Sequence, residues 1–166
     1  MSFEELYDKY FGRVYNYILY RVISPDIADD MVSLVFEKIL HKYSSFDPAK
    51  ATIAEAWIFA IARNTLNDYF RRKKILNWLS MSGMEDHIES GESLETDAEK
   101  HEVTAKVLKA VEQLSNPERE IIALKFTMDM TNRAIAGEMG LSESNVGVIL
   151  FRAMRKIKEL MEPEIL

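Results

Sequence analysis

The middle of the chain, SGMEDHIESGESLETDAEK at residues 82–100, contains almost nothing that a folded core could bury. Residues 75–104 carry one Lys against eight Asp and Glu, so the acid behind the formal net charge of -6 is concentrated there. A polar, acidic stretch that is poor in aromatic residues cannot bury enough apolar surface to offset its conformational entropy. We therefore expect two small modules, at residues 1–81 and 102–166, joined by an acidic flexible linker at residues 82–101.

Both modules are predicted to be helical. Apolar and β-branched residues recur at helical spacing, without the sustained period-2 alternation that marks strands. The fold class is therefore all-α, with helices expected at 3–22, 25–42, 53–74, 102–114, 117–127, 132–139 and 143–161. The segment ILNWLSM after residue 74 is apolar enough to dock as a helical extension, with Trp78 packing rather than stacking on a base.

Four helix starts are marked by capping signals. SFEE at residues 2–5 and TIAE at residues 52–55 read as capping boxes, in which a hydroxyl and a carboxylate satisfy N–H groups of the first turn. Ser24 and Asn116 each precede a proline, which places a cap residue before a proline at the first helical position.

The helix expected around AWIFAIARNTLNDYFRRKK, residues 56–74, separates apolar from polar side chains. Ile58, Ala62 and Leu66 fall on an apolar side. The polar stripe is formed by Arg63, Asn64, Asn67, Asp68 and Arg71, and Arg72, Lys73 and Lys74 follow it. Amides and guanidinium groups on one stripe suit base edges and phosphates, with Asp68 orienting an arginine. The alternative is an amphipathic core helix with a solvated back.

The string TNRAIAGEMGLSESNVGVILFRAMRKIKEL predicts a helix-turn-helix. Ala134, Ile135 and Met139 would line one side of a short helix that ends at Gly140, a position requiring φ > 0. Leu141 would fill the core and Ser142 would cap the second helix.

The second helix would bury Val146, Ile149 or Leu150, and Ala153. Its first turn would present Ser142, Ser144 and Asn145, followed by Arg152, Arg155 and Lys156 as possible phosphate contacts. Helical hairpins without a DNA role show similar spacing, so this motif alone does not settle the function.

Several classes of function are disfavoured by composition. The chain has no cysteine, which removes disulfides, thiolate metal sites and cysteine nucleophiles. No apolar run is long enough to span a membrane and no signal peptide is indicated, so we expect a cytoplasmic protein without direct membrane insertion. His41, His87 and His101 lack ligand spacing, and no Gly-rich phosphate loop occurs. We expect no catalytic residues, no metal and no cofactor.

Three stretches resemble the bacterial RNA polymerase sigma factors of the extracytoplasmic-function group. They are ADDMVSLVFEKIL, the AWIFAIARNTLNDYFRRKK helix, and VLKAVEQLSNPEREIIALKF with the helix-turn-helix that follows. The signature W-[LI]-x-x-I-A-R-N-x-x-x-D-x-x-R-R is matched from Trp57 to Arg72, and L-x-x-x-x-R-E is matched at Leu114, Arg119 and Glu120. The resemblance covers residues 3–74 and 104–161, in the family's order of regions 2 and 4.

The resemblance implies a subunit without catalytic activity that binds core RNA polymerase and directs it to promoters for melting and initiation. By family analogy, a face of Asp30, Ser33, Leu34 and Glu37 meets the polymerase clamp helices. The -10 element would be bound by Arg63, Asn64, Asn67, Asp68, Arg71, Arg72, Lys73 and Lys74, with Phe46 and Lys50 from the preceding loop. The -35 element would be bound by Arg133, Ser142, Ser144, Asn145, Arg152 and Arg155, while the same module grips the flap of the β subunit. The family also implies a dedicated anti-sigma factor.

Five positions depart from the family pattern. Ser33 and Leu34 replace Gln and an acidic residue, Ala134 replaces a frequent Glu, and Gly147 and Ile149 stand where Lys and Arg are common. These departures keep a second interpretation open, a sigma-like decoy that binds an anti-sigma factor without initiating transcription. A conventional helix-turn-helix repressor is disfavoured because it would leave the first module without a role.

The two missing cations generate a prediction about salt. Each phosphate contact contributes about one unit to the log-log salt dependence of DNA binding, so we expect a slope shallower by about 2 than in relatives with both cations. Titrating a -35 duplex at several salt concentrations measures the slope. A slope as steep as theirs would show that the two positions do not matter.

Overall fold

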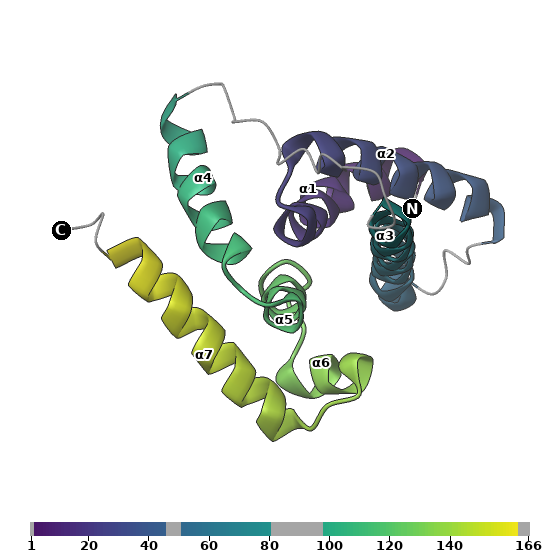
Figure 1. Ribbon diagram of the computed structural model, residues 1–166. Coiled ribbons are helices and arrows are strands. Elements are labelled where there is room, and N and C mark those ends of the chain that lie inside the picture. The colour runs from purple at the N-terminus through teal and green to yellow at the C-terminus, as the bar shows by residue number, and fades with distance from the viewer. Residues whose placement is uncertain (1, 46–50, 81–97, 163–166) are drawn as a thin grey trace. The chain divides into compact units, whose positions relative to one another are not determined.

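The computed structural model describes residues 2–45, 51–80 and 98–162, and in these ranges every regular element is helical (Figure 1). The elements are α1 (Phe3–Val22), α2 (Pro25–Lys42), the short 3-10 helix η1 (Tyr43–Ser45), α3 (Ala51–Ser80), α4 (Ala98–Glu112), α5 (Asn116–Phe126), α6 (Asn132–Met139) and α7 (Glu143–Met161). The all-α prediction is confirmed for the described residues, and α1, α2, α6 and α7 have the predicted bounds.

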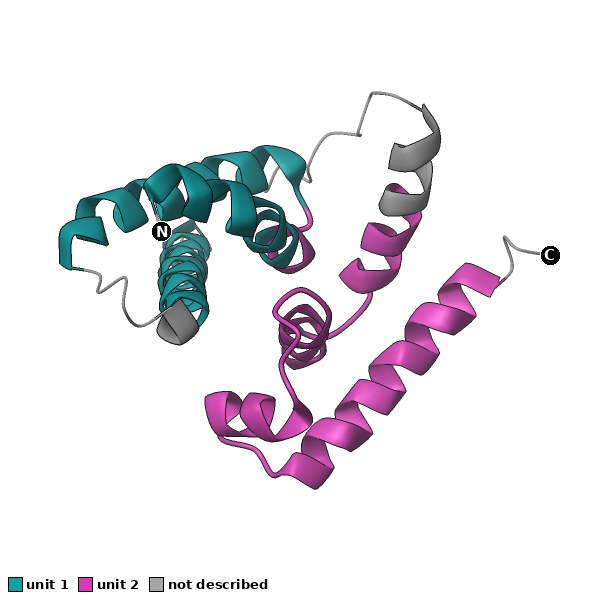
Figure 2. Cartoon of the chain, turned by 180° about the vertical axis from the view of Figure 1, so that it is seen from behind, with its two compact units in different colours: residues 1–18, 24–92 teal, residues 19–23, 93–166 magenta. Residues whose placement is uncertain are grey.

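The helices fall into two compact units (Figure 2). The first comprises residues 1–18 and 24–92, and the second residues 19–23 and 93–166. Most of the predicted acidic linker lies outside the described residues, but α4 begins at Ala98, inside its expected range. The prediction of a helix start at residue 102 was therefore four residues late.

The first unit is held by apolar faces of α1, α2 and α3. Ile58, Ala62 and Leu66 of α3 are buried at i, i+4 and i+8, the spacing that places them on one side of a helix. Each buried Ile or Leu side chain contributes about 1.5–3 kcal/mol relative to exposure. Between α2 and α3, Lys38 Nζ donates a hydrogen bond to Thr65 Oγ1 at 3.1 Å. These contacts fix which side of α3 is left outward.

The second unit has a small apolar core shared by three helices. Its buried members are Val111, Leu114, Ile122 and Ala153, with Val107, Leu150 and Ile157 packed against them. Along α7, Val146, Leu150, Ala153 and Ile157 recur at i, i+4, i+7 and i+11, and we call them the core stripe. Two members of the core stripe, Val146 and Ala153, are fully buried.

The predicted caps are formed with one correction. Ser2 and Glu5 make a reciprocal capping box, and Ser24 Oγ accepts from the Ile27 N–H at 3.4 Å. At α5 the cap is Ser115 rather than Asn116, because a second capping box joins Ser115 and Glu118. Asn116 and Pro117 occupy the first helical positions instead. The box expected at Thr52 cannot be compared, since that side chain lies outside the described residues.

Glu118 links the start of α5 to α7. Its Oε1 accepts from the Ser115 N–H at 2.9 Å and from Lys156 Nζ at 3.0 Å. Burial raises the pKa of the Glu118 carboxyl, but the hydrogen bonds from Ser115 and Lys156 outweigh burial and leave that pKa below its ordinary value. The carboxylate form is therefore favoured by folding.

This depressed pKa predicts how the second unit responds to acid. A group whose pKa is lowered by folding stabilises the fold above its unfolded pKa, and that stability is lost as pH falls through the folded pKa. Replacing Glu118→Gln should lower the thermal midpoint at pH 7 and reduce the further loss between pH 5 and about pH 3. Thermal unfolding of the full chain across that range measures both effects.

The matched control is Glu112→Gln, which neutralises an exposed carboxylate on α4 of the same unit. It should leave the pH dependence near that of the unchanged protein. An equal flattening by both substitutions would contradict the role given to Glu118.

Candidate nucleic-acid and polymerase interface

The polar stripe of α3 lies on the outer side of the helix. Asn64, Asn67, Arg71, Arg72 and Lys74 are exposed, whereas Ile58, Ala62 and Leu66 are buried on the other side. Arg63, Asp68 and Lys73 are half-buried at its edges. The expectation that Asp68 orients an arginine is met by its ion pair with Arg71. Phe46 and Lys50, predicted to accompany this stripe, lie outside the described residues.

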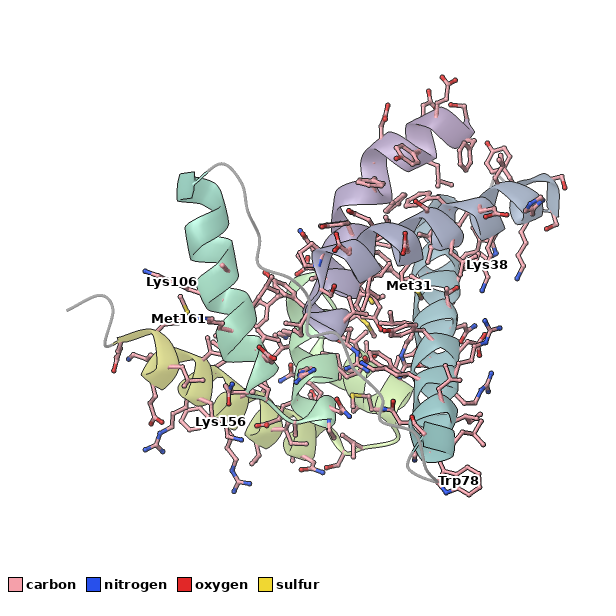
Figure 3. The ribbon with its side chains drawn as sticks, turned by 45° about the horizontal axis from the view of Figure 1, so that its top comes forward. Met31, Lys38, Trp78, Lys106, Lys156 and Met161 are labelled. Carbon is pink, nitrogen blue, oxygen red and sulfur yellow. The ribbon has the colours of Figure 1, made fainter. Side chains whose placement is uncertain are left out.

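The end of α3 differs from expectation. The helix continues through Ser80, as the apolar ILNWLSM segment indicated, but Trp78 is 71% exposed instead of packed. Figure 3 shows its indole ring projecting from the end of α3. Ile75, Leu76 and Leu79 are exposed in the same two turns. Helical periodicity predicted that α3 continues, but burial of its last two turns depends on tertiary contacts. Among the described residues, no core covers these turns.

The predicted polymerase face forms one strip along α2. Asp30, Ser33, Leu34 and Glu37 recur at i, i+3, i+4 and i+7, and all four are exposed. Met31, Val32, Val35 and Phe36 are buried on the other side, which explains why the strip is outward. The strip is acidic at both ends, with Leu34 between, and could receive a basic, partly apolar surface. The departures Ser33 and Leu34 both lie in it.

The helix-turn-helix is formed as predicted in its turn and caps. Gly140 has φ of 67° and ends α6, and the Leu141 N–H donates to the Ala136 carbonyl at 3.0 Å. Ser142 Oγ accepts from the Asn145 N–H at 3.1 Å and starts α7. Because Gly adopts this left-handed backbone conformation without a Cβ penalty, the short turn fixes how α7 follows α6.

Two details of this module were predicted wrongly. Ala134 is exposed, and Ile135 and Ala136 are the buried residues of α6. Leu141, expected to fill the core, is only half-buried. Ile135 is buried as predicted and Met139 is half-buried, so the error on α6 is confined to Ala134, whose expected place is taken by Ala136. A helix of two turns offers too little pattern to decide between these two alanines.

The predicted -35 residues are all on the surface. Arg133, Ser142, Ser144, Asn145, Arg152 and Arg155 are exposed. Arg155 Nε donates to Glu159 Oε1 at 3.2 Å on the same helix. Lys156, considered as a phosphate contact, instead pairs with Glu118 across to α5. Ser142 also acts as the N-cap, so part of its hydrogen-bonding capacity serves the fold.

Exposed apolar residues on α7 were not predicted. Val148 is 46% and Phe151 69% exposed. Together with Ser144 and Arg155 they recur at i, i+4, i+7 and i+11, and we call these four residues the outward stripe. The outward stripe is offset by two residues from the core stripe, which at 100° per residue places it on the opposite side of α7. The spacing could have been found in the sequence by comparing the two registers.

Metal and membrane features are absent from the described residues. No group of three or more His, Asp or Glu side chains there could hold a metal ion. None of the described helices combines the length and apolar character needed to cross a membrane.

Gly147 offers a direct test of charge on α7. A Cβ added there would meet only Asn132 Nδ2, at 3.9 Å, which is an ordinary van der Waals contact, so a side chain can start there without a clash. Gly147→Lys should stabilise α7 by about 0.5–1 kcal/mol and steepen the salt dependence of -35 duplex binding by about 1. Thermal unfolding and salt titrations of the full chain measure the two effects.

Gly12→Lys is the matched control, since a Cβ at Gly12 in α1 would meet nothing within 4 Å. It adds the same charge and helix propensity, and should change stability without changing the salt slope. If both variants steepen the slope equally, the effect comes from net charge and not from the position on α7.

Comparison with known proteins identifies the family. The Sigma-70 region 2 model matches residues 6–75, and the Sigma-70 region 4 model matches residues 104–157. The ECF RNA polymerase sigma factor BldN of Streptomyces coelicolor is 29% identical over 160 residues, which cover 96% of this chain and 60% of BldN. The RNA polymerase sigma factor SigZ of Bacillus subtilis is 28% identical over 163 residues, covering 98% of this chain and 88% of SigZ.

A solved structure shares the fold. The sigma factor RpoE of Bartonella quintana, crystallised with the anti-sigma factor NepR, aligns with a TM-score of 0.70 at 19% identity, covering 96% of each chain. The region 2 match spans α1 to α3 and the region 4 match spans α4 to α7, so the two matches together account for both modules. The chain belongs to the sigma-70 family, in its extracytoplasmic-function group.

Proposed function

We propose that this protein is a sigma factor that binds core RNA polymerase and directs promoter recognition, DNA melting and initiation. The observation that carries the proposal is the joint match to regions 2 and 4, each on a helical module that exposes most of the candidate residues among those described. The polymerase supplies the chemistry, and this subunit contributes binding and positioning. It would act in the cytoplasm.

Each surface has a distinct part in this proposal. The strip of Asp30, Ser33, Leu34 and Glu37 on α2 would contact the clamp helices of the polymerase. The polar stripe of α3 would contact the -10 element, with cations fixing the backbone and amides reaching base edges. The second module would grip the flap of the β subunit and place α7 in the major groove at the -35 element.

Melting is the step that most depends on α3. An unstacked base costs a few kcal/mol to extrude, so it must be held by contacts absent from duplex DNA. Asn64 and Asn67 are exposed amides that can hydrogen-bond a separated strand, and Arg71 is held in place by Asp68. Arg72 and Lys74 extend the cationic surface along the strand.

An anti-sigma factor is the remaining proposed partner. The group to which the chain belongs commonly has such regulators, and the structure of RpoE was solved in complex with the anti-sigma factor NepR. An anti-sigma factor would compete for the same exposed strips of α2 and α7, because both must be uncovered for polymerase and promoter binding.

Run-off transcription with core polymerase separates the two functions left open by the sequence. A sigma factor yields promoter-dependent transcripts, whereas a decoy yields none and relieves inhibition only when an anti-sigma factor is present. Absence of transcripts from a randomised promoter library, with core binding retained, would favour the decoy.

Charge reversal on α3 tests the melting surface. Arg72→Glu should reduce the formation of open promoter complexes by about tenfold, equivalent to about 1.4 kcal/mol, while leaving core polymerase binding unchanged. Permanganate reactivity of unpaired thymines measures opening, and co-purification measures core binding.

Lys9→Glu provides the matched control, because Lys9 is an exposed cation on α1 of the same unit. It changes the charge by the same amount away from the α3 stripe and should leave opening intact. Equal loss in both variants would remove the assignment of melting to α3.

A further inference from the structure

The outward stripe of α7 combines apolar and cationic side chains in a way that the proposed phosphate contacts do not explain. Val148 and Phe151 occupy its two central positions, with Ser144 before them and Arg155 after them. Neither apolar residue contributes to the core, because the core stripe lies on the opposite side of the helix. Exposed large apolar side chains on a recognition helix call for an apolar contact on the DNA.

The dimensions of the stripe fit the major groove. Residues 144 to 151 span about 10 Å along a helix, at 1.5 Å per residue, and the groove is about 12 Å wide. Arg152 and Arg155 lie beside Phe151 and can anchor on phosphates, while Ser144 and Asn145 in the first turn can reach polar base edges. Val148 and Phe151 would then face the base edges between them.

One base offers an apolar group in this groove. Thymine carries a C5 methyl there, and apolar side chains, including Phe, contact it directly. Cytosine has only a hydrogen at C5, and the polar groups that guanine, adenine and cytosine present in this groove cannot be satisfied by an exposed Phe or Val. An apolar pair therefore discriminates in favour of thymine.

We propose that Val148 and Phe151 read thymine methyl groups in the -35 element, so that apolar contacts set sequence preference where the family's cations at positions 147 and 149 are missing. This inference rests on the proposed function, since it requires α7 to enter promoter DNA. A protein helix with apolar and acidic residues could also cover the stripe. DNA is favoured because the stripe belongs to the second helix of a formed helix-turn-helix, ends in Arg155 and has Arg152 beside it.

The test removes methyl groups from DNA without changing its sequence. Holoenzyme assembled from the full chain and core polymerase is first used to enrich promoters from a randomised library. One enriched promoter is then prepared in three forms: unchanged, with deoxyuridine for every thymine of the -35 element, and with deoxyuridine for the same number of thymines upstream. Deoxyuridine differs from thymidine only in lacking the C5 methyl.

We expect holoenzyme to bind the deoxyuridine -35 form about fourfold more weakly for each contacted methyl, and the upstream form unchanged. Phe151→Ala and Val148→Ala should each bring the thymine-to-uracil affinity ratio closer to one. Met154→Ala is the matched control, since Met154 is also exposed on α7 but lies outside the outward stripe, and its ratio should stay that of the unchanged protein. The ratio compares two DNAs with one protein, so partial unfolding of a variant does not imitate the effect.

Three results would overturn the inference. One is equal affinity for thymine and uracil forms by a holoenzyme that initiates normally, which leaves the proposed function intact. Another is an enriched -35 element without thymine on either strand. The third is a Phe151→Ala variant with full DNA discrimination but weakened binding to an anti-sigma protein, which would assign the stripe to that partner. Failure to enrich any promoter would instead remove the proposed function together with this inference.

Discussion

The rotation of α7 about its own axis is set by burial of the core stripe. Val146 and Ala153 have no exposed surface, and Leu150 and Ile157 pack against the same small core. Turning the helix by one residue, or 100°, would expose these side chains and bury cations in their place, which is far more costly. This packing therefore determines which α7 side chains are free of the core and can reach DNA. Lys156 illustrates it, because its position, one residue beyond Arg155, brings its Nζ within 3.0 Å of Glu118 Oε1.

The same constraint acts on α3 in the first unit. Ile58, Ala62 and Leu66 are buried against the bundle, and the Lys38 to Thr65 hydrogen bond adds a polar contact at the same side. The amides of Asn64 and Asn67 are outward as a consequence of that packing. In both modules, a folded core orients a polar or mixed surface on the opposite side of one helix, although the surfaces differ in chemistry.

The sequence predicted these cores because helical periodicity repeats over many turns in α3 and α7. The sequence predicted wrongly where a helix is short or where two neighbouring residues can both serve as its cap. Ser115 and Asn116 are both good caps, and only Glu118, three residues after Ser115, decides between them by closing a capping box. In α6 the pattern placed Ile135 correctly, but two turns were too few to decide between Ala134 and Ala136. Trp78 was expected to pack because it is large and apolar, but its exposure depends on whether tertiary contacts reach the end of α3.

The candidate site was predictable to a different degree in each part. The polar residues of α3 and the strip on α2 came from spacing and from family resemblance, and the structure places those it describes on the surface. Val148 and Phe151 were overlooked because apolar residues in an amphipathic helix are usually assigned to the core. Only the observed burial of the core stripe distinguishes them from core residues.

The core stripe and the outward stripe share no residue, and this affects how the module tolerates substitutions. Substitutions on exposed positions away from packing generally change stability by no more than about 0.5 kcal/mol. Substitutions at residues 148 and 151 can therefore change the promoter preference of this module while the fold stays intact. Sequence specificity and stability can evolve almost independently here.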